Sequence, residues 1–181
     1  KLEERMNVKI IRVLNTNAVV SSDQEGRELI ITGAGIGFKK KKGENLDEAL
    51  ADKTYYLESV DDSRRLQEVV KEISEEYLEI VSRIVKTARE EGLKVRDSLY
   101  VTLTDHINSA VDRYRENIAL KNMMKLEIRK FYPKEYEIGL RAVQWIQEQN
   151  DENLGEDEAA FIAMHIVSAE LGSGSNVDVN K

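Results

Sequence analysis

Two patterns of apolar residues divide the chain near residue 60. Before that point, short runs rich in β-branched residues alternate with turn residues, which is typical of strands. We predict four strands, over residues 8–14, 17–22, 27–32 and 54–57. After that point, apolar residues recur every three or four positions, which predicts amphipathic helices. The fold class is therefore α+β, with a small four-stranded antiparallel β domain followed by an all-α bundle.

The second pattern predicts about five helices. The first begins at the capping residues Asp61–Ser63 and ends at Gly92. The sole proline, Pro133, stands where a helix would start, because its φ is already suitable there. We predict helices over residues 61–92, 98–110, 120–131, 133–146 and 156–171.

The same division predicts the domain organisation. We expect a β domain over residues 6–60, a helical domain over residues 63–172, and a linker or frayed end over residues 173–181. A domain of about 55 residues with four short strands buries little apolar surface. We therefore expect the sheet to dimerise.

Charge is distributed unevenly between these domains. The whole chain has a formal net charge of −7, but residues 6–42 carry seven basic and three acidic side chains. A basic N-terminal segment therefore precedes an acidic remainder of the chain, and the net charge of the whole chain hides this difference. The chain contains no cysteine, which excludes disulfides and thiolate metal sites. With no apolar run long enough for a membrane span and no signal peptide, we expect a cytoplasmic protein.

Asparagines, glycines and lysines gather in the predicted β domain. Asn15-Thr16-Asn17 forms a turn, and the run 33–38, GAGIGF, leads into four lysines rather than a helix, which disfavours a phosphate loop. Glycine lets a backbone approach a base, and Phe38 could stack on one. Arg12 and the lysines would contact phosphates. The alternative interpretation uses the glycines and asparagines for turns and buries Phe38 in the core.

Both histidines fall in the helical domain. His106 and His165 each border the apolar stripe of a helix, where an ordinary packed histidine also lies. Neither has the local spacing of a metal site, and no nucleophile motif accompanies them. A neutral imidazole can instead accept a phosphoryl group. Arg113, seven positions after His106, would favour the added charge, and Asp105 adjoins it.

These motifs resemble a known family of regulators. The segments VKIIRVLNTNAVV and GRELIITGAGIGFKKKKG resemble the co-antiterminator RNA-binding domain of the BglG/SacY/LicT/GlcT transcriptional antiterminators. The segments SLYVTLTDHINSAVDR, FYPKEYEIG and EDEAAFIAMHIVSAEL resemble the first PTS-regulation domain of the same family. The order and spacing agree from about Val8 to Leu171.

For the β domain, the resemblance implies a dimer that binds an RNA hairpin in a leader transcript and keeps a competing terminator from forming. Ala34 stands where some members carry a basic residue, which changes one expected contact. The RNA-binding residues implied are Arg12, Asn15, Asn17, Arg27, Gly33, Phe38, Lys39 and Lys40.

For the helical domain, the resemblance implies phosphorylation of His106 and His165 by the sugar phosphotransferase system. The donors would be the phosphocarrier HPr and a sugar-specific enzyme II, with Asp105 and Arg113 beside the first site. We expect a homodimeric regulator that is not an enzyme, with no cofactor, metal, membrane or DNA partner. Members normally carry a second regulatory domain, so we expect a truncated chain, and Lys121–Met124 replaces a common Asn-Pro pair.

Two other classes stay open on the residues alone. A DNA-binding regulator with the same sensory domain would need a recognition helix, whereas the basic residues here lie in β segments. An enzyme would use a histidine in phosphotransfer or in a metal-dependent hydrolysis.

Overall fold

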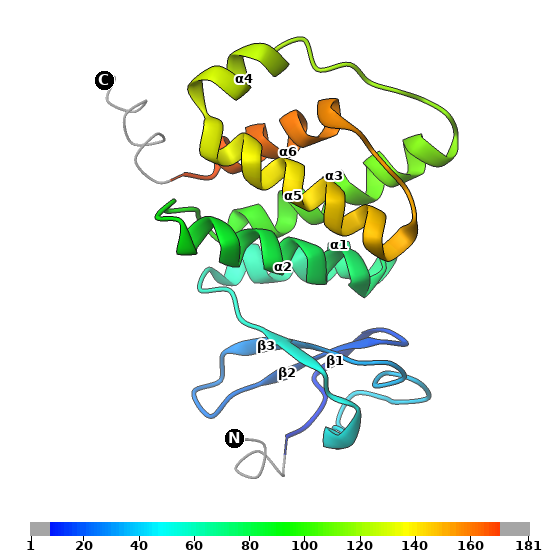
Figure 1. Ribbon diagram of the computed structural model, residues 1–181. Coiled ribbons are helices and arrows are strands. Elements are labelled where there is room, and N and C mark those ends of the chain that lie inside the picture. The colour runs from blue at the N-terminus through cyan, green and yellow to red at the C-terminus, as the bar shows by residue number, and fades with distance from the viewer. Residues whose placement is uncertain (1–7, 171–181) are drawn as a thin grey trace. The chain divides into compact units, whose positions relative to one another are not determined.

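The computed structural model describes residues 8–170, which divide into two compact units. The first unit extends to Glu75 and contains the sheet, a short 3-10 helix (Glu48–Leu50) and helix α1 (Val60–Glu72). The second unit begins at Glu76 and contains the other α-helices (Figure 1). Residues 6 and 7 of the expected β domain, and the expected linker or frayed end at 173–181, lie outside the described residues. The last predicted helix position, Leu171, lies outside them as well.

The first unit contains one antiparallel sheet in the order β1-β2-β3-β4, which confirms the predicted α+β fold. Its strands are β1 (Arg12–Asn15), β2 (Ala18–Ser22), β3 (Glu28–Thr32) and β4 (Lys53–Tyr55). Strand β1 is shorter than expected. Its predicted first residues bond instead to a loop, with the Ile10 amide donating to Glu44 and the Leu46 amide donating to Val8.

The two faces of this sheet carry different side chains. On one face, Val19 of β2 is paired with Ile31 of β3. Both pack with apolar residues from the strands and from the segments before β1 and after β3. This core consists of Ile10, Val19, Leu29, Ile31, Ile36 and Leu46. Residues directly opposite in a ladder share a face. The register therefore places one row on the second face: Arg12, Val20, Ile30 and Tyr55.

Helix α1 (Val60–Glu72) belongs to the first unit. The Ser59 side chain caps it by accepting from the Asp62 amide at 3.1 Å, so the helix begins before the predicted caps. The predicted continuous helix over residues 61–92 is wrong, because Ile73 is extended and a second helix begins at Glu75. The sequence of Ser74 followed by two glutamates favours a new helix start at this point.

The second unit is a helical bundle (Figure 1). Its helices are α2 (Glu75–Glu90), α3 (Ser98–Arg115), α4 (Lys125–Phe131), α5 (Pro133–Asn150) and α6 (Glu156–Ser168). Helices α5 and α6 pack closely, since a Cβ on Gly139 would lie 2.2 Å from the Ala159 carbonyl oxygen. Pro133 begins α5 as predicted. Helix α4 starts later than predicted because the Asn122 side chain accepts from the Met124 amide at 2.8 Å, a local bond that competes with helix.

Along residues 8–170, none of the helices combines the length and the apolar character that crossing a membrane would require.

Candidate functional site

Hydrogen bonds join the asparagine turn to the glycine-rich loop. Asn15 Oδ1 accepts from the Asn17 amide at 2.7 Å, and Asn17 Oδ1 accepts from the Gly35 amide at 2.9 Å. The Gly37 amide donates to the Thr16 carbonyl at 2.8 Å. The two motifs lie about twenty residues apart in the sequence. These bonds join them into one surface, the loop surface, and Asn17 is the side chain that links its two parts.

Phe38 and the lysines after it face solvent. Phe38 is 59% exposed, which contradicts the alternative that it belongs to the core. Lys39 Nζ lies 5.4 Å from the centre of the Phe38 ring, within the range of a cation–π contact. Lys39 has a φ of 57°, so the backbone turns sharply directly after the aromatic residue. The loop thus presents an aromatic ring and cationic groups together.

Two glycines of the loop are needed for packing within the unit. A Cβ on Gly33 would lie 1.8 Å from the Leu50 carbonyl oxygen, and one on Gly37 would lie 2.2 Å from the Asn15 carbonyl oxygen. The fold itself therefore excludes a side chain at both positions. Close approach to a base is not needed to explain Gly33.

The predicted arginines have acidic partners. Arg12 is bound to Glu28, with the shorter contact at 2.7 Å, and its side chain is 36% exposed. Arg27 bonds to Asp23 at 2.8 Å. Since Asp23 follows β2 and Asn17 precedes it, Arg27 lies at the opposite end of the strand from the loop surface. The structure brings together Asn15, Asn17, Gly33, Phe38, Lys39 and Lys40 in adjoining loops, and leaves Arg27 apart.

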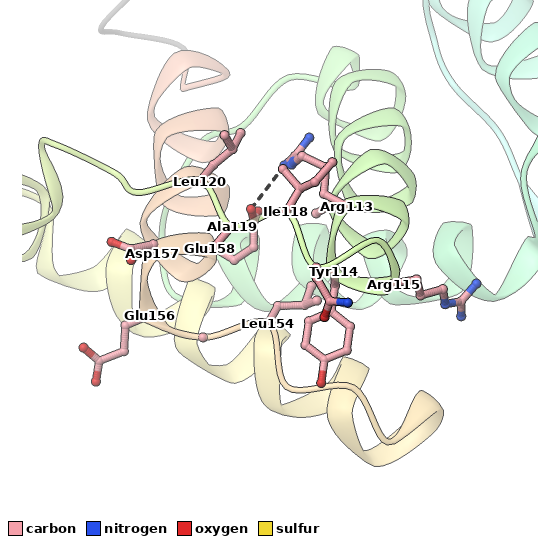
Figure 2. Close-up of a pocket in the computed structure, with 13 residues that line it drawn as sticks. Arg113, Tyr114, Arg115, Ile118, Ala119, Leu120, Leu154, Glu156, Asp157 and Glu158 are labelled. Atoms are coloured by element: carbon pink, nitrogen blue, oxygen red, sulfur yellow. Dashed lines mark hydrogen bonds and ion pairs between the residues drawn. The ribbon is translucent and has the colours of Figure 1, made fainter.

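In the second unit, the two histidines lie side by side. His106 on α3 and His165 on α6 have ring centres 4.7 Å apart. His106 Nε2 lies 2.6 Å from Glu158 Oε1, and Arg113 bonds to the other oxygen of Glu158 at 3.3 Å. Figure 2 shows this ion pair between Arg113 and Glu158. Asp105 is exposed.

The surroundings keep one imidazole neutral. Burial, followed by the nearby His106, lowers the pKa of His165 to about 4, so this ring is uncharged at neutral pH and keeps a nucleophilic lone pair. His106 Nε2 lies within hydrogen-bond distance of Glu158, and which ring nitrogen carries the hydrogen depends on the tautomer. The neutral ring of His165 is therefore the one whose lone pair the surroundings preserve.

Sequence reasoning missed Glu158. It lies seven positions before His165, on the same side of α6 two turns earlier, and this spacing is the signal that could have found it. The carboxylate is buried and bridges His106 to Arg113 across α3 and α6.

A cleft of about 550 Å³ opens beside this group. Arg113 and Glu158 line it, together with the loop over residues 117–120 that follows α3 (Figure 2). Among residues 8–170, no three acidic, histidine or cysteine side chains are grouped so that they could hold a metal ion.

Comparison with known proteins agrees with both units. Residues 8–64 match the family described as the CAT RNA binding domain, and residues 78–169 match the PRD domain. The chain is 38% identical over 167 residues to the beta-glucoside operon antiterminator of Dickeya chrysanthemi, which covers 92% of this chain. This chain belongs to the CAT–PRD family, with a CAT RNA binding domain followed by a PRD domain. LicT of Bacillus subtilis is also 38% identical, over 165 residues and 91% of the chain.

A solved structure shares this CAT–PRD arrangement. The crystal structure of GlcT CAT-PRDI aligns with a TM-score of 0.72 and 27% identity, covering 90% of this chain and 98% of that one. The chain spans 59% of the Dickeya chrysanthemi relative and 60% of LicT. In this CAT–PRD chain, the loop surface lies within the CAT match and the histidine pair within the PRD match.

Proposed function

We propose that this chain is a transcriptional antiterminator. The first unit binds an RNA hairpin in a leader transcript and prevents a competing terminator from forming. The protein works in the cytoplasm as a homodimer. The observation that carries the proposal is the exposed Phe38 beside a run of lysines, on loops that Asn17 joins, in a chain of the CAT–PRD family.

The chemistry of this surface suits an RNA hairpin with unpaired bases. Stacking of one base on an aromatic side chain is worth about 1–3 kcal/mol. Lysines supply contacts to phosphates, which give affinity and orientation without reading sequence. Asn17 Nδ2 lies 3.4 Å from both carboxylate oxygens of Glu75, and it can exchange this contact for the edge of a base or a sugar hydroxyl. A protein uses the sugar hydroxyl to distinguish RNA from DNA.

Binding of a leader hairpin to the Phe38→Ala variant tests this proposal. Loss of one stacked base should weaken binding about tenfold. Tyr56→Ala is a matched control, because Tyr56 is also an exposed aromatic but stacks beside Arg27 at the other end of β2. Equal effects of the two substitutions, or tighter binding to a matched DNA duplex, would contradict the proposal. Affinity should also fall steeply as salt increases.

The second unit would receive the regulatory signal. His106 and His165 would accept phosphoryl groups from phosphorylated HPr or a sugar-specific enzyme II. The lone pair of the neutral imidazole forms the new N–P bond while the N–P bond of the donor histidine breaks, and the donor nitrogen regains its lone pair. Arg113 would favour the added negative charge, and Asp105 and Glu158 would oppose it.

Regulation follows from the charge that phosphorylation adds. Each phosphoryl group brings about −1.5 to −2 charges at neutral pH. In the unphosphorylated state, the second unit would dimerise and hold two RNA-binding units together. Added charge in an already acidic domain would loosen this dimer and weaken RNA binding.

Incubation with labelled phospho-HPr and phosphorylated enzyme II tests the phosphorylation sites. The chain contains only these two histidines, so His106→Ala combined with His165→Ala must abolish acid-labile labelling. His106→Asp with His165→Asp should lower the affinity for the hairpin in a chain that keeps both units. Unchanged affinity would contradict the regulatory mechanism but leave the RNA-binding proposal intact.

A further inference from the structure

Helix α1 covers the second face of the sheet, which carries Arg12. The Arg12 guanidinium donates to the Gln67 side chain of α1 at 2.7 Å, so the helix lies over the row that Arg12 shares with Val20 and Ile30. The buried residues of α1 recur at helical spacing and form one stripe: Ser63, Leu66, Gln67 and Val70. Half of this stripe is polar. The helix is therefore held to the sheet by hydrogen bonds as well as by apolar packing.

The polar part of this contact occupies Arg12. Its two terminal nitrogens donate to both oxygens of Glu28, at 3.1 and 2.7 Å. Glu28 also accepts from Gln67 at 2.9 Å and from Arg64 at 3.1 and 3.2 Å, and both of these partners are on α1. The hydrogen bonds from Arg12, above all, lower the pKa of Glu28 to about 2, so the carboxylate stays ionised and balances the charge of the arginine. Glu28 lies on β3, so the sheet itself holds part of Arg12, and docked α1 adds Gln67, which bonds to both Arg12 and Glu28.

The end of α1 occupies an asparagine of the loop surface. Asn15 Nδ2 donates to the Val70 carbonyl at 2.8 Å. This carbonyl belongs to the last turn of the helix, where it also accepts from the Ile73 amide at 3.4 Å. Asn15 Oδ1 is already used by the Asn17 amide. The donor of Asn15 is therefore directed to the helix rather than to an RNA base.

We propose that α1 competes with RNA for the sheet of the same chain. When α1 is docked, it bonds to Arg12 and Asn15, and it must leave the sheet before the hairpin binds with full affinity. This inference rests on the proposed RNA-binding function and adds the control of that site. A helix of 13 residues is marginal when isolated in water, so undocked α1 would gain little from its own helical bonds. Residues 73–74 join α1 directly to α2, which makes this helix the covalent link through which the second unit can act.

Two substitutions on α1 test the competition in the full chain. Arg64→Ala with Gln67→Ala removes the helix partners of Glu28 and Arg12 without changing the sheet or the loops. Arg65→Ala is the matched control, because it removes the same charge from α1 but pairs only within the helix, with Asp61. If docking limits binding, the double variant should bind a leader hairpin about fivefold or more tightly than the control. Equal affinities would overturn the inference.

Amide hydrogen exchange of the wild-type chain provides a second measurement that needs no substitution. Addition of the leader hairpin should speed the exchange of α1 amides over residues 63–70, because bound RNA selects the undocked helix. Unchanged or slower exchange in this helix, with RNA bound, would also overturn the inference. If neither the wild type nor the variants bind the hairpin, the proposed RNA-binding function fails instead.

Discussion

The carboxylate of Glu28 offers a quantitative test of how the first unit is held together. It accepts hydrogen bonds from Arg12 and from two residues of α1, while its side chain is only 19% exposed. These bonds lower its pKa from an ordinary 4.5 to about 2. A change of this size corresponds to about 3 kcal/mol of stability. Because solvent screens a partly exposed pair, we expect about 2 kcal/mol.

The sign of the pH dependence follows from this lowered pKa. In the unfolded chain, Glu28 takes up a proton near its ordinary pKa, whereas in the folded chain it stays ionised until about pH 2. The unfolded state therefore binds more protons between these values, and stability falls as the pH is lowered from about 5 to about 2. At neutral pH the contribution is fully present. The Glu28→Gln variant should be less stable than wild type by about 2 kcal/mol at pH 7, and the difference should vanish near pH 2.

Urea unfolding followed by NMR cross-peaks of Val20 and Ile30 would report on this unit alone. The titration should be repeated at several pH values from 7 to 2. Glu25→Gln is the control, because Glu25 is an exposed glutamate whose ion pair is with Arg27 in the adjoining turn. If Glu28→Gln and wild type unfold at the same urea concentration across this range, the network does not stabilise the unit and the reasoning is wrong.

Three further predictions concern other positions. Gly33→Ala should destabilise the first unit by more than about 3 kcal/mol in urea unfolding, because its Cβ would meet a backbone oxygen, whereas Gly35→Ala, strained but unobstructed, should cost about 1 kcal/mol. The imidazole NMR signals of His165 should not titrate until about pH 4, and stability should fall as the pH drops from about 6.5 to that value. Gly139→Ala should lower the thermal midpoint of the second unit by several degrees, measured by circular dichroism, and an unchanged midpoint would contradict the close packing of α5 on α6.

Some features of this protein follow from local sequence. The period of apolar residues predicted the strands and helices, because side chains alternate along a strand and repeat every three to four residues in a helix. Pro133 marked the start of α5, because its fixed φ fits the first helical position. Local rules failed where a short-range bond competes with helix, as Asn122 does before α4.

The resemblance to antiterminators identified residues in both units from sequence. It pointed to the histidines and to the loops at Asn17 and Phe38, because motif order along the chain is a property of sequence alone. The neighbours of these residues could not be read in the same way. The exposed fraction of the Phe38 side chain depends on which parts of the folded chain pack against its ring.

Tertiary structure decided which polar groups meet. Glu158 lies 52 positions from His106, and Gln67 lies 55 from Arg12, so no periodic pattern links either pair. Their pairing depends on which helix faces which surface, and that choice follows from the burial of whole apolar stripes rather than from any single residue. The sequence by itself thus determined most of the elements and the candidate residues, but not the break between α1 and α2. Only the folded chain brought Glu158 between His106 and Arg113, and placed α1 over Arg12.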